Sequence, residues 1–139
     1  MIQVIISGCF SAYNSATDGG FAYSFTCHFH MTNNNEIYNN SALNDGGAIF
    51  LVESVLDFFE GSSLIVNNTA GNKGGALHLV NSNIFLFLEP TIKFSNNMVT
   101  SVNGKGGAIF VLDCGDILLV PTKDVLCYTT RITSTHLTF

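Results

Sequence analysis

The chain has 139 residues, enough for one modest hydrophobic core, and 47% of them are hydrophobic while only 11% are charged. A soluble domain usually has about 25% charged residues. Amphipathic helices need charged residues on their solvent-exposed face, so the composition disfavours a helical repeat protein. The five Lys and Arg residues and the net charge of −5 exclude a basic surface for nucleic acid. No apolar run approaches the ~18 residues of a membrane-spanning segment.

Residues 1–36 are predicted to form a degenerate first turn of a repeat. Ile6-Ser7-Gly8-Cys9 looks like a lipoprotein box, but no Lys or Arg precedes it and the apolar run is short, so a β-strand is the preferred reading. Cys27-His28-Phe29-His30 follows, and in a strand its two histidines share one face. A structural zinc site needs four ligands and no partner cluster is evident, so no metal and no cofactor are predicted.

Three clear copies of a repeat occupy residues 37–112, and each contains an Asn-Asn pair and a Gly-Gly-Ala run. The copies are Ile37–Phe50, Ile65–His78 and Phe94–Phe110, and a worn copy precedes them at Ser11–Tyr23. From Gly19 to Gly46 is 27 residues, from there to Gly74 is 28, and from there to Gly106 is 32. The last interval includes an insertion at 100–102, and such insertions fall in loops on one side of a solenoid.

Between the markers the chain has three short β-rich runs per repeat, such as 48–52, 55–59 and 63–66. This pattern predicts an all-β fold, a right-handed parallel β-helix of about four to five turns with a pectin-lyase-like architecture. Residues 1–139 are interpreted as a single domain, in which 113–139 form a degenerate turn or a cap. The sequence leaves open whether the chain is a fragment of a longer repeat protein.

The markers have a structural reading, because equivalent positions of a parallel solenoid stack at about 4.8 Å along its axis. Stacked asparagines satisfy one another's hydrogen bonds, so one Asn of each pair is expected to lie inside a corner. Gly pairs supply a positive φ or a close approach at sharp corners. The expected ladder is Asn14, Asn40, Asn68 and Asn97, and the expected Gly corners are Gly19, Gly20, Gly46, Gly47, Gly74, Gly75, Gly106 and Gly107.

The sequence Phe/Ile-x-x-Asn-x-Ala followed by Gly-Gly-Ala-Ile resembles the chlamydial polymorphic membrane protein repeat, over roughly residues 37–112. The third copy departs from the pattern, with Val99 where Ala is expected. The resemblance implies a cell-surface or extracellular location, as in the surface-exposed passenger of an autotransporter, and a role in adhesion. A surface glycan or protein is then the expected kind of partner.

One column of residues is a candidate binding surface: Tyr23, Phe50, His78 and Phe110. The flanking positions are aliphatic in the three clear copies, so strand alternation turns the column outward, where it could grip a sugar ring or a partner surface. In the worn copy the flanking residues Ala22 and Ser24 are poor core residues, which argues against an outward-facing column. The alternative is that the column has no binding role and is ordinary core or ordinary surface.

The cysteines and two asparagines carry further expectations. Cys9–Cys27 and Cys114–Cys127 would brace the two ends if the compartment is oxidising, although four cysteines allow three pairings. Asn39 and Asn67 lie in glycosylation sequons, which matter only in a protein secreted by a eukaryote.

Catalysis is not expected. Polysaccharide-active β-helices need clustered carboxylates, whereas here the Asp and Glu residues are scattered, and the close pair Asp113 and Asp116 lies beyond the last clear repeat. The sequence therefore predicts a non-catalytic surface module for adhesion or spacing. The alternative is a carbohydrate-binding or polysaccharide-processing β-helix.

Overall fold

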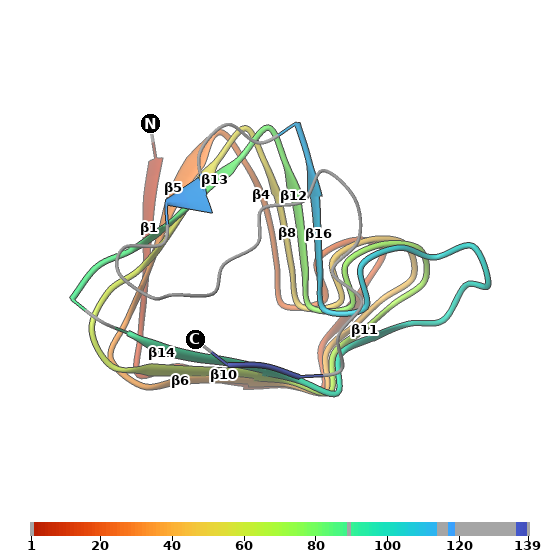
Figure 1. The fold of residues 1–139 in the computed structure, drawn as a ribbon, viewed down its shortest axis with the longest axis horizontal. Helices are drawn as coiled ribbons and strands as arrows, with labels where there is room; N and C mark the ends of the chain where they lie inside the picture. Colours follow the sequence, from red (N-terminus) through yellow and green to blue (C-terminus); the bar gives the residue numbers. More distant parts are fainter. Residues whose placement is uncertain (1, 89, 114–116, 119–135, 139) are drawn as a thin grey trace.

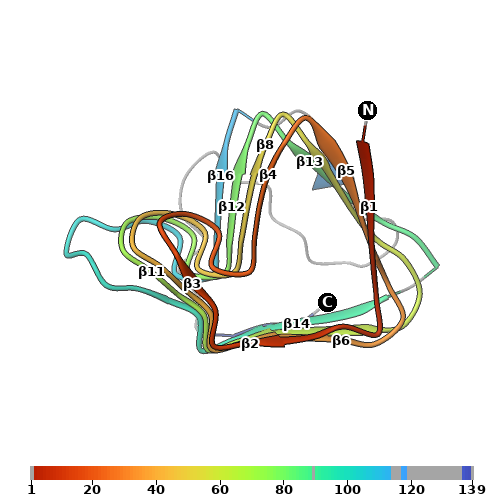
Figure 2. The same ribbon diagram turned by 180° about the vertical axis from the view of Figure 1, so that it is seen from behind.

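The chain folds as a parallel β-solenoid of about four turns, seen along its axis in the computed structural model of Figure 1 and from behind in Figure 2. The structure describes residues 2–88, 90–113, 117–118 and 136–138. All regular elements in these ranges are β-strands, so the predicted all-β parallel solenoid is confirmed. No helix in the described ranges is long and apolar enough to cross a membrane.

Each full turn contributes one strand to each of four sheets, here called A to D. Sheet A contains β1 (Ile2–Ser7), β5 (Cys27–Thr32), β9 (Val55–Phe58), β13 (Asn83–Leu86) and β17 (Ile117–Leu118). Sheet B contains β2 (Phe10–Ala12), β6 (Asn35–Tyr38), β10 (Ser62–Val66), β14 (Thr91–Ser95) and β18 (His136–Thr138). Sheet C contains β3 (Ser15–Ala16), β7 (Ser41–Ala42), β11 (Thr69–Ala70) and β15 (Met98–Val99). Sheet D contains β4 (Ala22–Phe25), β8 (Ile49–Val52), β12 (Leu77–Val80) and β16 (Ile109–Leu112).

The expected three strands per turn are corrected to four, because sheet C was missed. Its strands have two residues each and directly follow the Asn markers, so they are too short to give a run of β-forming residues. All strand pairs are parallel except the pair between β14 and β18, which is antiparallel. Most of the predicted terminal turn or cap at 113–139 lies outside the described residues.

The core is a column of aliphatic and aromatic side chains inside the coil. Neighbouring turns place equivalent residues in register, so Ile49 pairs with Leu77 and Leu77 with Ile109. Phe58 in β9 and Ile65 in β10 are 1% and 0% exposed. Burial of each such side chain contributes about 1.5–3 kcal/mol to the free energy of unfolding, which makes this column the main stabilising feature.

The four marker asparagines form a hydrogen-bonded ladder at the corner between sheets B and C. The side-chain amides of Asn14, Asn40 and Asn68 each donate to Oδ1 of the next ladder asparagine, at 2.9, 3.0 and 3.0 Å. The backbone N–H of each donates to the same oxygen. Asn40, Asn68 and Asn97 are at most 5% exposed, and the ladder satisfies polar groups that would be costly to bury alone.

The Gly pairs form the corner that leads from the Asn-to-Gly loop into sheet D. The first glycine of each pair has a positive φ, for example +65° at Gly46. The second glycine of the first three pairs lies against the next turn, and a Cβ on Gly47 would lie 2.0 Å from the carbonyl oxygen of Gly75. The loops form a lobe beside sheet D in Figure 1, and the loop between β15 and β16, which holds the insertion at 100–102, extends farthest.

Candidate functional site

The outer face of sheet A carries histidine, aspartate and phenylalanine side chains that lie in contact with one another. Strand alternation directs every second side chain outward, and the parallel register stacks these side chains across turns. Ile5 pairs with His30, and His30 with Asp57. We call the group His28, His30, Asp57, Phe59, Phe85 and Phe87 the sheet A face.

The two histidines share one carboxylate. Nε2 of His28 lies 2.5 Å from Oδ2 of Asp57, and Nδ1 of His30 lies 3.2 Å from the same oxygen. The imidazole rings stack with centroids 4.1 Å apart. His28 and His30 belong to β5 and Asp57 to β9, so the cluster depends on the register of one turn upon the next.

Asp57 is buried although it points to the outside of the coil. The residue is 3% exposed, and its Oδ1 has no hydrogen-bond partner among the described residues. The side chains of His28 and His30 retain 27% and 18% exposure. A carboxylate is thus held beneath two accessible imidazoles, an arrangement able to bind a cation, and these three side chains meet as a group of potential metal ligands.

Aromatic rings continue the sheet A face beyond the histidines. The ring of Phe59 lies 5.6 Å from that of His30 and 5.0 Å from that of Phe87, between centroids. Phe85 and Phe87 lie 6.2 Å apart, and Phe87 is 41% exposed. The rings form a ladder that crosses three turns, and the surface of this ladder is largely apolar.

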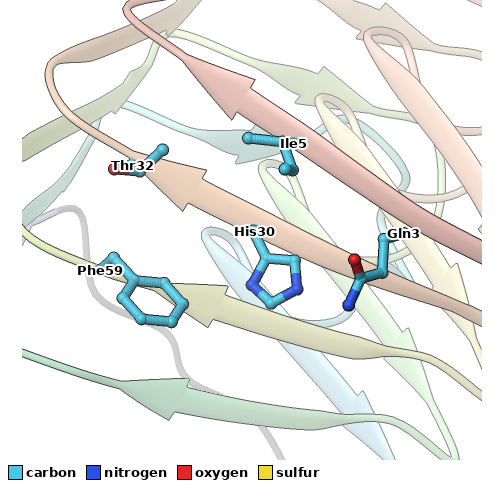
Figure 3. Close-up of a pocket in the computed structure, with 5 residues that line it drawn as sticks. All are labelled: Gln3, Ile5, His30, Thr32 and Phe59. Atoms are coloured by element: carbon cyan, nitrogen blue, oxygen red, sulfur yellow. The ribbon is translucent and has the colours of Figure 1, made fainter.

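An open pocket of about 360 Å³ lies beside this ladder and is shown in Figure 3. Its lining side chains are Gln3, Ile5, His30, Thr32 and Phe59. His30 therefore belongs both to the pocket and to the cluster around Asp57. The pocket offers an apolar ring and aliphatic wall together with amide, hydroxyl and imidazole groups.

The column that was expected to bind lies on sheet D and is only partly accessible. Its side chains alternate with core residues and point away from the coil interior, as the alternation predicted. Tyr23 is 56% exposed, but His78 and Phe110 are only 2% and 8% exposed. The imidazole of His78 stacks on Phe50 with centroids 4.5 Å apart. The four residues therefore do not form one exposed stripe.

The Asn-to-Gly loop covers the middle of this column. Asp45 and Lys73 lie in the loops of two successive turns and pair through their backbones. Nζ of Lys73 lies 5.6 Å from the ring centroid of Phe110. Oδ2 of Asp45 lies 3.2 Å from Nδ1 of His78. Burial and the nearby Lys73 lower the pKa of His78 to about 4, and burial raises the pKa of Asp45. The imidazole is neutral at pH 7, so the contact is not an ion pair.

The structure does not join Cys9 to Cys27, and both are free thiols. Residues stack in this coil when they are about one repeat apart, and these two occupy different corners. Cys9 lies between β1 and β2, whereas the backbone N–H of Cys27 donates to Oγ of Ser54, its equivalent one turn on. Cys114 and Cys127 lie outside the described residues.

The two sequon asparagines lie at the outer side of the ladder corner. Asn39 and Asn67 have positive φ angles of 53° and 56°, which turn them away from the buried ladder. Asn67 is exposed and Asn39 is half-buried.

Asp57 is the functional residue that sequence reasoning missed. It follows His30 by 27 residues, which equals the interval from Gly19 to Gly46, so the repeat itself predicts that the two stack. The sheet A ladder has the same signal, because Phe59 and Phe87 are 28 residues apart.

Comparison with protein families gives three matches to the Chlamydia polymorphic membrane protein repeat, at residues 36–51, 62–79 and 91–112. No curated protein matches the chain, and no solved structure does. The matched segments run through sheets B, C and D and contain three of the four ladder asparagines, together with Asp45, Lys73 and His78. The sheet A face lies outside them. The chain is a parallel β-solenoid that carries three repeats of the Chlamydia polymorphic membrane protein type.

Proposed function

We propose that the chain is a non-catalytic, cell-surface adhesion module that contacts its partner through the sheet A face. The repeat match supports a surface-associated solenoid, because it names a family of membrane proteins. The single observation that carries the choice of face is the ring ladder from His30 through Phe59 to Phe87, beside an open pocket. Exposed apolar rings that adjoin polar groups are typical of interaction surfaces.

The chemistry of this face supports binding without catalysis. Strands β1, β5, β9 and β13 contain one carboxylate, Asp57, whereas glycoside hydrolysis uses a pair of them. These strands contain no Lys or Arg. A surface of this composition gains affinity from apolar contact and ring stacking, and a few polar groups orient the partner.

A second candidate function, carbohydrate binding, is favoured by the same rings. An aromatic ring buries a large apolar area at small conformational cost, and a sugar ring presents a matching apolar face. A glycan partner would stack on Phe59 or Phe87 and hydrogen-bond to Gln3 or Thr32 in the pocket. A protein partner would cover the whole ladder.

A bead-adhesion assay tests the proposal, with the purified chain coupled to beads that are applied to cell monolayers and, in parallel, to a glycan array. We expect the beads to adhere, and a Phe59→Ala and Phe87→Ala double variant to lose at least about tenfold in adhesion, as hot-spot residues do. Phe10→Ala is the matched control, because Phe10 is 65% exposed on sheet B.

Signal on the array that disappears in the double variant would assign a carbohydrate partner. Adhesion that persists in the double variant but falls in the Phe10 variant would place the interaction on sheet B instead. Failure of the wild-type beads to bind in either format would contradict adhesion and favour a spacer.

A further inference from the structure

We propose that His28, His30 and Asp57 form a binding site for a divalent transition-metal ion of the Zn²⁺ type. The three side chains offer Nε2 of His28, Nδ1 of His30 and Oδ2 of Asp57, and these atoms all lie within 4.8 Å of one another. Metal binding by these three side chains does not depend on the proposed adhesion, because it needs no partner molecule on the sheet A face.

The donor set selects the class of metal. Imidazole nitrogen suits Zn²⁺, Cu²⁺ and Ni²⁺, whereas Ca²⁺ and Mg²⁺ take oxygen ligands. In a tetrahedral zinc site with bonds of about 2.0–2.1 Å, neighbouring ligand atoms are about 3.3 Å apart. The contact of 3.2 Å between His30 and Asp57 already meets this spacing. The contact of 2.5 Å between His28 and Asp57 needs a small side-chain rotation to admit the ion.

The state of Asp57 points independently to a cation. Its carboxyl group is nearly fully buried, and its Oδ1 has no hydrogen-bond partner among the described residues. A buried oxygen without a donor is costly, and a buried carboxylate is normally compensated by a positive charge. The neighbouring strands β1, β5 and β13 contain no Lys or Arg that could supply one, so the charge must come from the two imidazoles or from a bound ion. A bound metal ion would supply that charge at the place where the imidazole nitrogens converge.

The fold preorganises the three ligands. His28 and His30 share a face of β5 because they are two residues apart. Asp57 is held opposite His30 by the parallel ladder between β5 and β9. Three protein ligands leave a coordination position for water. His30 also lines the open pocket, and the remaining exposure of both imidazoles gives an ion access from solvent.

The experiment is calorimetric titration of the full chain, without an affinity tag, with Zn²⁺ at pH 7.5. We expect one equivalent to bind with a micromolar dissociation constant, and the thermal midpoint to rise with Zn²⁺ concentration because the ion binds the folded state. Asp57→Asn and, separately, His28→Gln should each weaken binding at least tenfold. His78→Gln is the matched control, since His78 also lies beside an aspartate but is covered, and it should bind as the wild type does.

Co²⁺ provides the second measurement, because its visible absorption reports the ligands. The proposal predicts ligand-field bands without thiolate charge transfer, and these bands should disappear in the His28 variant. Thiolate charge transfer would place the ion on cysteines and overturn the proposal. The absence of Zn²⁺ binding by the wild type would overturn it, as would unchanged affinity in both Asp57→Asn and His28→Gln. Circular dichroism of each variant establishes that it is folded.

Discussion

Two outer faces of the solenoid each place histidine beside aspartate, and the surroundings of the two contacts differ. On sheet D, His78 lies beneath the Asn-to-Gly loop and is 2% exposed. On sheet A, His28 and His30 keep part of their surface in solvent while Asp57 is the buried partner. The first contact buries the imidazole, and the second buries the carboxylate.

The difference coincides with the boundaries of the repeat. His78, Asp45 and Lys73 lie within the segments that match the polymorphic membrane protein repeat, and the sheet A face lies outside those segments. The repeat therefore encodes the corners, the ladder and a covered sheet. Sheet A completes each turn with residues outside the matched segments, and it is here that rings and imidazoles reach the surface above a buried carboxylate.

The largest expected effect on the free energy of unfolding distinguishes the inner face of sheet A from its outer face. Phe58 is 1% exposed in the core, whereas its neighbour Phe59 points outward and is half-buried. Phe58→Ala should lower the free energy of unfolding by about 3–5 kcal/mol, because it opens a cavity. Phe59→Ala should cost only about 1 kcal/mol. Urea denaturation measures both, and equal losses would mean that the sheet A face is packed like core.

The next effect tests the corner that leads from the loop into sheet D. Gly47→Ala places a methyl group against the backbone of the next turn and should cost about 3 kcal/mol. Gly8→Ala is the control at the corner after β1, where the added carbon meets no atom within 4 Å. It should cost about 1 kcal/mol, from its positive φ alone. Similar losses in thermal or urea unfolding would refute the tight approach at Gly47.

A smaller effect is a pH dependence from the covered imidazole. The pKa of His78 falls to about 4 in the folded chain, against about 6.5 when unfolded. Between these values the unfolded state binds more protons, so stability rises with pH in this window and is level above it. Lowering the pH from 6.5 to 5 should therefore reduce the free energy of unfolding by about 1 kcal/mol through His78, after allowance for solvent screening.

His78→Phe isolates that contribution, since Phe continues the ring column between Phe50 and Phe110 and does not titrate. Unfolding of the wild type and of this variant should be compared across pH 4–7. The variant should have the flatter profile. Parallel profiles would show that His78 is not buried as a neutral group.

Much of the fold could be predicted, because in a solenoid the repeat interval is also the stacking register. The ladder of Asn40, Asn68 and Asn97 follows directly from that identity. The same interval joins His30 to Asp57, so the cluster was open to prediction from the sequence. The burial of His78 was not, because it depends on the path of the loop through Asp45, and no local pattern encodes that path.

The sheet A histidines are accessible to solvent, whereas the sheet D histidine is covered. Diethyl pyrocarbonate labelling of the folded chain, read residue by residue by mass spectrometry, tests it directly. We expect His28 and His30 to be modified early, and His78 to remain protected until the chain is unfolded in denaturant. Modification of His78 in the folded chain as fast as that of His30 would contradict the account.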